Sequence, residues 1–489
     1  MNKMRKHLIL AVLVGLGLRL FFVLWFPAEE AGDTPLYEEL AWNWLNQHVY
    51  GLSLNGGFEP VDIRAPGYPA FLAMIYALAG PSRLAVMLVQ AGLDLVTCVV
   101  AAALAGCLAP QEQRQRVAIA ALWLSATCPF IANYSAAVLT EVLATFLTAL
   151  ALLVFVSALD RKDLSSRSWY LGGLLVGLGT LVRPETPLLL VAVAPPLVAR
   201  WRRPADWPKL ARVGALAAVG VLVPLAPWAV RNWHTLHRVQ FLAPRYSELP
   251  EEYVPRGFYA WTRTWLVRFR DVYLVPWKLE EKPIQIEGLP AAAFDSAEER
   301  ARVTALIEQY NTTLGISPEM DREFAQIARE RTARHPLRTY LWIPLGRAAT
   351  LWFTPRMELT PFTGALWPPR KMWEEDPVDF SFTAGSGLLN FVYAGLALAG
   401  AWRWRSHAGL VLPIAFIALR TAFFTQVETP EPRYVLECFP AVLALAALAW
   451  AKPSPTPAQQ KTDPARPATL VQNYQPRQNA RSAHKETAA

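Results

Sequence analysis

The chain has 489 residues, of which 53% are hydrophobic and only 18% are charged. Soluble globular proteins usually carry about 25% charged residues. Long apolar runs joined by short basic segments therefore predict an all-α polytopic membrane protein and exclude an ordinary soluble domain. The formal net charge is +8, but much of the positive charge falls in short loops between apolar runs, which argues against nucleic-acid binding.

The four cysteines have no metal-type spacing, and each lies in or beside an apolar run. We interpret them as small buried hydrophobic residues and expect no disulfide framework. They are Cys98, Cys107, Cys128 and Cys438.

The basic N-terminus "MNKMRKH" precedes a long apolar run at 8–26. A cleaved signal peptide is the alternative, but this run contains Arg19 and lacks a small-residue cleavage pattern before "PAEEAGD". We predict a retained first membrane span with its N-terminus in the cytoplasm.

Nine further spans are predicted from the apolar runs, which gives about ten transmembrane helices. The short loops assigned to the inside are rich in Lys and Arg, whereas the loop 28–67 carries seven acidic residues and one basic residue, Arg64. This asymmetry follows the positive-inside rule and predicts that both termini are cytoplasmic. The further spans are expected at 84–108, 116–132, 135–158, 169–183, 186–200, 211–230, 384–402, 407–424 and 433–450.

Four regions follow from this topology. Residues 1–230 form an N-terminal transmembrane module whose first outer loop is 28–83, with "RAPGYPAFLAMIYALAG" (64–80) as a helix on the outer membrane face. Residues 231–383 form a mainly helical extracytoplasmic region, in which the aromatic run 337–353 lies on the membrane. Whether 66–80 or 337–353 enters the membrane stays open. The helices of 384–451 complete the membrane part, and the polar tail 452–489 is expected to be a disordered cytoplasmic segment.

Charged groups inside or beside the spans are informative, because burying them in lipid costs several kcal/mol unless they are paired or hydrated. Arg19 and Asp94 lie at similar depths and are predicted to form an ion pair, which is structural or else contacts substrate. A second set lies at the outer membrane face on five separate connections. One such residue is usually an interfacial anchor or a salt bridge, but the convergence predicts a site for a lipid with a charged head group. The set includes Asp33, Arg64, Glu141, Arg183, Glu185, Arg231, Glu428, Glu431 and Arg433.

Arginine and carboxylate groups gathered at the outer membrane face suit the transfer of a sugar from a lipid phosphate. Guanidinium groups bind phosphate oxygens through planar, bidentate donors and fit a polyprenyl-phosphate leaving group. A neighbouring carboxylate can accept a proton from an acceptor hydroxyl or amine as it attacks a sugar.

Several stretches together resemble the GT-C membrane glycosyltransferases, in the branch of protein O-mannosyltransferases and aminoarabinose transferases. They include "GDTPLYEELAWNWL", "RAPGYPAFLAMIYALAG", "VLTEVLATF", "LVRPETPLLL", "PLAPWAVRNWHTLHRVQFLAP" and "EPRYVLECFPAVLALAALA". The resemblance implies an enzyme that moves a sugar, with inversion, from a polyprenyl-phosphate donor to a lipid, glycan or protein acceptor. It further implies the extracytoplasmic face of a bacterial inner membrane.

The resemblance assigns the essential acid of the first outer loop to Asp33, as general base. Arg64, Arg183, Arg231 and Arg433 become candidates for donor phosphate or acceptor contacts. Two further groups are candidates. Glu141 and Glu185 are candidate substrate contacts, and Tyr68 and Tyr434 are cavity-lining residues or interfacial anchors.

The sequence departs from the family at one point, because relatives often have Asp-Glu where this chain has Asp33 and Thr34. Glu38 is a possible substitute, although its i, i+5 spacing need not place it on the same face. Some relatives hold a divalent metal, so a metal is a possible cofactor. The histidines of "NWHTLHR", His234 and His237, have i, i+3 spacing but lack an obvious carboxylate partner motif.

Two other functions stay open. A lipid or solute transporter usually has inverted repeats and a site near the bilayer midplane, whereas this chain has no convincing repeat and gathers its charges at one face. A non-catalytic GT-C-like scaffold that binds lipid-linked sugars would retain the same acids and arginines.

Overall fold

The computed structural model describes residues 3–28, 32–162, 164, 166–201, 203–244, 246 and 253–451. All of them belong to one unit, Met1–Ala451. Two predicted features lie outside the described residues. They are Glu30, which is expected on a solvated rim of the first outer loop, and the tail 452–489.

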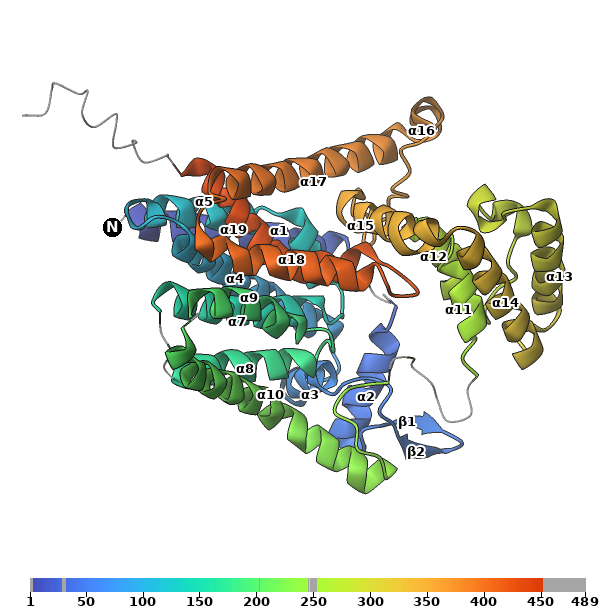
Figure 1. Cartoon of the computed structure of the whole chain (residues 1–489), viewed down its shortest axis with the longest axis horizontal. Helices are drawn as coiled ribbons and strands as arrows, with labels where there is room; N and C mark the ends of the chain where they lie inside the picture. Colours follow the sequence, from blue (N-terminus) through green and yellow to red (C-terminus); the bar gives the residue numbers. More distant parts are fainter. Residues whose placement is uncertain are drawn as a thin grey trace, which may run out of the picture. The chain divides into compact units, whose positions relative to one another are not determined.

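Helices occur at all ten predicted span positions. Figure 1 shows most of them running side by side, with α8 packed on α10 and α4 packed on both α5 and α7. Their bounds are α1 (Lys3–Trp25), α4 (Arg83–Leu108), α5 (Arg114–Ala126), α7 (Glu141–Asp160), α8 (Ser166–Thr180), α9 (Leu188–Arg200), α10 (Trp207–Leu236), α17 (Pro377–Arg403), α18 (Val411–Phe424) and α19 (Phe439–Ala447).

Within the described residues, six helices are long and apolar enough to cross a membrane, or seven if one bent pair counts as a single span. The bent pair joins Gln111–Ala126 to Pro129–Ala136 at an angle of 52°. The predicted span 116–132 is therefore broken. Pro129, in the first turn of α6 (Pro129–Ala132), has no N–H to continue the α5 ladder. The helices Leu188–Arg200 and Ala408–Phe424 are apolar but shorter, so ten spans stays a prediction.

Close backbone approach fixes the α8–α10 pair. A Cβ on Gly173 would lie 2.1 Å from the Ala217 carbonyl oxygen, and one on Gly220 would lie 2.4 Å from that of Tyr170. Small residues at such crossings let membrane helices pack tightly without a water-driven hydrophobic effect between them.

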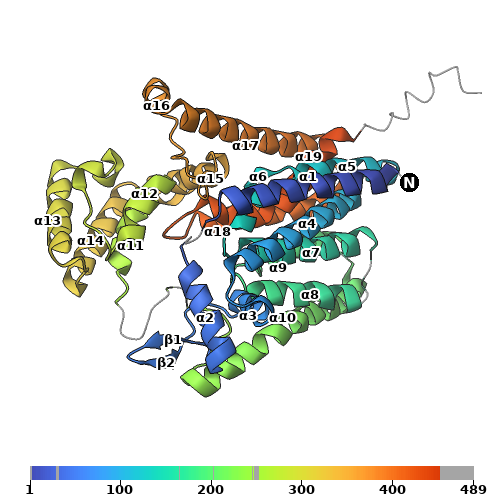
Figure 2. The same ribbon diagram turned by 180° about the vertical axis from the view of Figure 1, so that it is seen from behind.

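The first outer loop forms a small structure of its own. It consists of α2 (Thr34–Gln47), the antiparallel hairpin β1 (Gly51–Leu54) and β2 (Gly57–Pro60), and α3 (Gly67–Ala79), with α2 packed on α3. Figures 1 and 2 show this group at the end of the helix bundle opposite the N-terminus. The segment predicted as an outer-face helix is thus helical, as α3.

The region after α10 lies at the same end of the bundle (Figures 1 and 2). It has a separate hydrophobic core built around Phe258, Trp261, Ile307 and Phe324. The aromatic run predicted at 337–353 forms the π-helical turn Arg338–Trp342 and then α15, which begins just before Pro344. The helices are α11 (Arg256–Thr262), α12 (Phe269–Leu274), α13 (Ala297–Thr313), α14 (Pro318–Arg334), α15 (Ile343–Phe353) and α16 (Pro369–Glu375).

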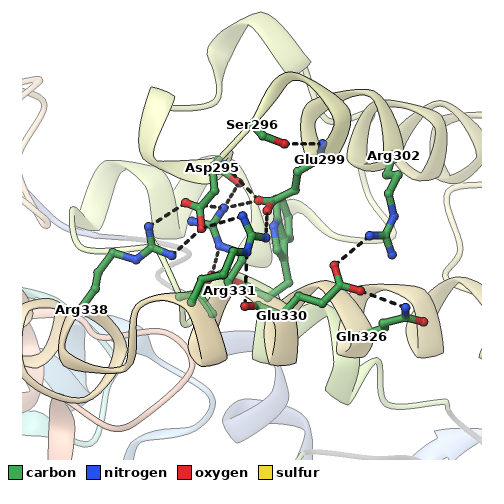
Figure 3. A network of polar contacts seen from close by, with 12 residues as sticks. Asp295, Ser296, Glu299, Arg302, Gln326, Glu330, Arg331 and Arg338 are labelled. Carbon is green, nitrogen blue, oxygen red and sulfur yellow. Dashed lines mark hydrogen bonds and ion pairs between the residues drawn. The ribbon is translucent and has the colours of Figure 1, made fainter.

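An ion network joins α13, α14 and the π-helical turn (Figure 3). Glu299 binds Arg331, which is fully buried, and Asp295 binds both Arg338 nitrogens at 2.6 and 2.8 Å. Arg334 binds Glu299 at 2.5 Å. The ion pairs of this network link α13 to α14 through Glu299, Arg331 and Arg334.

Candidate active site

Asp33 is the N-cap residue of α2, which begins at Thr34 with Pro35 in its first turn. Ala28 N–H donates to the Ala136 carbonyl at 2.9 Å, and the Thr34 hydroxyl donates to the Val138 carbonyl at 3.0 Å. These bonds fix the start of α2 against the segment that precedes α7. Asp33 therefore lies beside the connection that leads into α7, although the two segments are far apart in the sequence.

Arg64 is the partner of Asp33. Its Nη2 donates to Asp33 Oδ1 at 2.8 Å, and the two side chains are 19% and 37% exposed. One turn into α2, the buried Tyr37 ring packs edge-on against Tyr68 at 5.2 Å between centroids. The carboxylate is thus partly accessible while its immediate surroundings are fixed.

Gly67 explains why "RAPGYP" meets "LVRPETP". Its N–H donates to the Leu181 carbonyl at 2.8 Å. A Cβ at this position would lie 2.6 Å from that oxygen and 2.9 Å from the Val182 side chain. Only glycine allows this approach, which brings the Arg64 segment against the turn that carries Arg183.

Arg183 lies in the turn between α8 and α9 and contacts three carboxylates. Its nitrogens lie 3.0 Å from Glu141, 2.9 Å from Glu185 and 3.3 Å from Glu437. Glu141 is the first residue of α7 and is 1% exposed. Acids at the start of a helix are favoured by its macrodipole, and the arginine compensates the remaining cost of burying this one.

Residues of the last outer connection complete the cluster. Arg433 binds Glu431 at 2.5 Å and lies 3.5 Å from Glu141, and the Tyr434 hydroxyl donates to Glu431 at 2.6 Å. Arg420, from α18, contacts Glu437 at 2.5 Å and Glu185 at 3.1 Å.

One polar cavity of about 150 Å³ lies at the centre of this cluster. A cavity of that size accepts a single ring in other proteins. Six of the residues predicted as site residues line it, together with Tyr37 and Thr140. The six are Asp33, Glu141, Arg183, Glu185, Arg433 and Tyr434.

Opposing effects set the charge of the acids around the cavity. Burial raises the pKa of Asp33, but Arg64, with Arg433 and Arg183, outweighs burial and holds it below its ordinary value of 3.8. Burial raises the pKa of Glu185 too, and Arg183 and Arg420 lower it further than burial raises it. For Glu431 burial prevails over Arg433 and raises the pKa. Asp33 is therefore a carboxylate at neutral pH.

Four predicted residues lie elsewhere. Tyr68 is buried behind Tyr37, and its hydroxyl donates to Gln90 at 2.9 Å. Arg231 donates to the carbonyls of Val61 and Tyr50 at 2.8 and 2.6 Å and lines a different cavity. Arg19 and Asp94 form a buried ion pair at 2.7 Å, between α1 and α4.

The neighbouring acid of the family has no direct replacement at the cavity. Thr34 is buried and bonded to Val138. Glu38 turns to another face, where it binds Arg83 at 2.7 Å and accepts a bond from Tyr76 at 3.3 Å. Among the described acids in and just before α2, Asp33 alone lines the cavity.

Sequence reasoning missed Arg420 and Glu437, which are almost completely buried. Each is a charged residue within or at the end of an apolar run, "FIALRTAFF" and "RYVLECFP". The cost of burying an unpaired charge, which pointed to Arg19 and Asp94, was a sufficient signal for both.

The described residues contain no group of three or more His, Cys, Asp or Glu side chains placed to hold a metal ion. The carboxylates at the cavity each contact an arginine. His234 packs on Trp233 with 5.0 Å between ring centroids, and His237 caps the end of α10.

Known proteins resemble this chain in part. Residues 63–229 match the family model described as dolichyl-phosphate-mannose-protein mannosyltransferase. This range contains five of the predicted site residues at or near the outer face: Arg64, Tyr68, Glu141, Arg183 and Glu185. No curated protein sequence matches the chain.

Among solved structures, the oligosaccharyltransferase of Archaeoglobus fulgidus in complex with zinc and sulfate is 15% identical, with a TM-score of 0.47. The match covers 91% of this chain and 48% of that one. The oligosaccharyltransferase AglB of Archaeoglobus fulgidus, in complex with an inhibitory peptide and a dolichol-phosphate, is 13% identical, with a TM-score of 0.46, and the match covers 91% of this chain and 50% of that one. The chain thus spans about half the length of these structures. The family match, over residues 63–229, confirms the predicted resemblance to the GT-C membrane glycosyltransferases.

Proposed function

We propose that this membrane protein transfers a sugar from a polyprenyl-phosphate donor to an acceptor in the 150 Å³ cavity, with Asp33 as general base. The observation that carries the proposal is the shared cavity of one partly exposed carboxylate, Asp33, and two arginines, Arg183 and Arg433. The family that matches residues 63–229 is described by a lipid-phosphate-linked mannose donor, which supports this donor class.

The chemistry is a single displacement. Asp33 accepts the proton of an acceptor hydroxyl or amine while the acceptor atom forms a bond to the anomeric carbon. The bond from that carbon to the phosphate oxygen breaks on the opposite side, which inverts the anomeric configuration. Arg183 and Arg433 bind the phosphate oxygens as negative charge develops on the leaving group.

Arg64 has a positioning role in this scheme. It holds Asp33 in one orientation at 2.8 Å and keeps it ionised. The fully buried Arg420, beneath the cavity, holds Glu185 and Glu437 and leaves Arg183 aligned between its carboxylates. We further propose that the site faces the extracytoplasmic side of a bacterial inner membrane and that region 231–383 contributes to acceptor choice.

A transfer assay tests the proposal. Purified chain receives radiolabelled polyprenyl-phosphate sugars and a mixed acceptor extract, beside Asp33→Asn and the control Glu39→Gln. Glu39 lies on the same helix and bonds the exposed Ser53 N–H at 2.7 Å. We expect Asp33→Asn to lower the rate by about 10²–10⁴-fold, the usual range for a general base, and the control to retain it. Equal labelling by both variants removes Asp33 from the catalytic role. No labelling by the wild type favours a transporter or a binding scaffold.

A further inference from the structure

A second polar cavity, of about 570 Å³, lies outside the candidate active site. Residues of α11, α14, the π-helical turn, α15 and the loop after α18 line it, and it shares no residue with the Asp33 cavity. Three of its lining residues are arginines, and none is Asp or Glu. The arginines are Arg263, Arg329 and Arg347.

Arg347 places a positive charge beside this cavity, and only the more distant Glu428 among the described carboxylates offsets part of it. Its side chain is 1% exposed and donates to the carbonyls of Leu266 at 2.8 Å and Val427 at 2.9 Å. Its Nη2 is buried without a hydrogen-bond partner among the described residues, and no described carboxylate lies within ion-pair distance. By contrast Arg19, Arg331 and Arg420, which are equally buried, each pair with a carboxylate.

Burial lowers the pKa of Arg347 to about 10; the neighbouring Arg263 adds to this effect and Glu428 opposes it. The guanidinium is therefore still charged at neutral pH. A buried charge without a directly contacting counter-charge is costly, so a bound anion at this cavity would stabilise it.

Arg263 and Arg329 add to the positive charge. In the described part of the chain neither guanidinium forms an ion pair or a hydrogen bond, and Arg329 is exposed. Two buried acids of this region, Asp295 and Glu299, pair with Arg331, Arg334 and Arg338 and do not line the cavity (Figure 3). Hydroxyl groups of Thr332 and Thr339 complete the polar lining.

An exposed apolar face adjoins the cavity. Leu337, Tyr340 and Trp342 are 67%, 73% and 62% exposed, and Tyr340 itself lines the cavity. Exposed aromatic and aliphatic residues beside arginines are typical of protein surfaces at the lipid headgroup level. π-helical turns, such as the one at Arg338–Trp342, frequently occur at functional sites.

From these contacts we propose that the cavity lined by Arg263, Arg329 and Arg347 binds a phosphate group, carried by a membrane lipid whose apolar part lies along Leu337, Tyr340 and Trp342. Free phosphate offers the same head-group chemistry, but it makes no use of the apolar face. The site binds without a reaction and does not require Asp33.

Binding measurements on the full chain in detergent test this site. The probes are dihexanoyl phosphatidic acid and inorganic phosphate at equal ionic strength, titrated by calorimetry. The test variant is Arg263→Gln/Arg329→Gln, which removes two guanidinium groups without internal bonds. The control is Arg322→Gln on α14, where Arg322 is exposed and pairs with Glu319.

We expect phosphatidic acid to bind the wild type and the control equally. Each arginine removed should weaken binding by about fivefold, since a basic residue near a lipid phosphate contributes about that factor. Unchanged binding by the double variant, or no binding by the wild type, overturns the site. Inorganic phosphate that binds as tightly as the lipid overturns the lipid carrier. Asp33→Asn should bind the lipid normally, which separates this result from the transfer assay.

Discussion

Arg64 Nη2 lies 2.8 Å from Asp33 Oδ1, and this ion pair joins the start of α2 to the segment that precedes α3. The two residues are 31 positions apart in the chain. The pair has two consequences, because it orients the proposed base and it lowers the pKa of Asp33 against the opposing effect of burial.

The first prediction concerns pH. In Arg64→Gln, burial continues to raise the pKa of Asp33 while its main opposing charge is gone. Since the base acts only when deprotonated, the acid limb of the rate profile should move to higher pH. At pH values above that limb, where Asp33 is deprotonated in both proteins, the rate of Arg64→Gln should fall less than it does on the limb. The pH dependence of kcat/KM measures this, with Arg83→Gln as control, since Arg83 binds Glu38 instead. An acid limb that stays in place or moves to lower pH contradicts the assignment.

Much of the candidate site could be predicted because charges in an apolar chain are costly and must find partners. Asp33, Arg183 and Arg433 are far apart in sequence, yet all three line one cavity. The alternation of apolar runs and basic loops predicts that they share one level. The family match confirms the resemblance that the motifs of this level predicted.

The arrangement around the bundle was not predictable in the same way. A residue's depth follows from its place in a span, but which helices are neighbours depends on tertiary packing. Arg231 lies near the C-terminal end of α10, but it contacts Tyr50 and Val61, on a different part of the first outer loop. The missing N–H of Pro129 is a sequence signal for a break in the span 116–132. The span prediction, which rested on apolar composition, did not use that signal.

A second prediction concerns the buried pair of Arg19 and Asp94. Either Arg19→Met or Asp94→Leu leaves one buried charge without its partner and should cost about 3–5 kcal/mol of stability. The double substitution should cost less than the sum. The free energy of unfolding in detergent measures this cycle. Removing the exposed pair Arg114–Asp160, at 49% and 38% exposure, should cost less than about 1 kcal/mol. Additive costs at the buried pair would contradict the prediction.

The network in Figure 3 makes the α13–α14 region sensitive to acid. Burial raises the pKa of Asp295, but Arg338 and Arg331 outweigh it, so the folded-state pKa lies below the ordinary value of 3.8. A carboxyl with a depressed folded pKa contributes stability that is fully present above its unfolded pKa. That stability is lost as the pH falls through the folded pKa.

We therefore expect Asp295→Asn to destabilise this region by about 1.5–3 kcal/mol at neutral pH, the range for a bond to a charged group. The difference from wild type should shrink as the pH falls below 3.8. Hydrogen exchange of α13 and α14 measures both effects, with Glu319→Gln, at an exposed pair, as the control. A difference that persists in acid would show that the charge of Asp295 is not the cause.

The topology gives a fourth test. Asn55 lies in the hairpin turn of the first outer loop, and Arg203 lies in the connection between α9 and α10. In a chain without its native cysteines, Asn55→Cys should react with a membrane-impermeant thiol reagent in intact cells. Arg203→Cys should react only after the membrane is opened. Labelling of both from one side would reject the proposed orientation.

The last prediction concerns the glycine that brings the two arginine-bearing motifs together. A methyl group on Gly67 would lie 2.6 Å from the Leu181 carbonyl oxygen, so Gly67→Ala must push α3 away from the turn that carries Arg183. We expect a loss of about 1–3 kcal/mol, as for other overpacked contacts, together with a large loss of transfer because Arg64 and Arg183 move apart. Unfolding and transfer rate are measured on the same preparation. Gly92→Ala is the matched control: its Cβ meets nothing within 4 Å, and alanine favours a helix interior over glycine by about 1 kcal/mol. If Gly67→Ala retains both stability and transfer, the close approach does not hold the active site together.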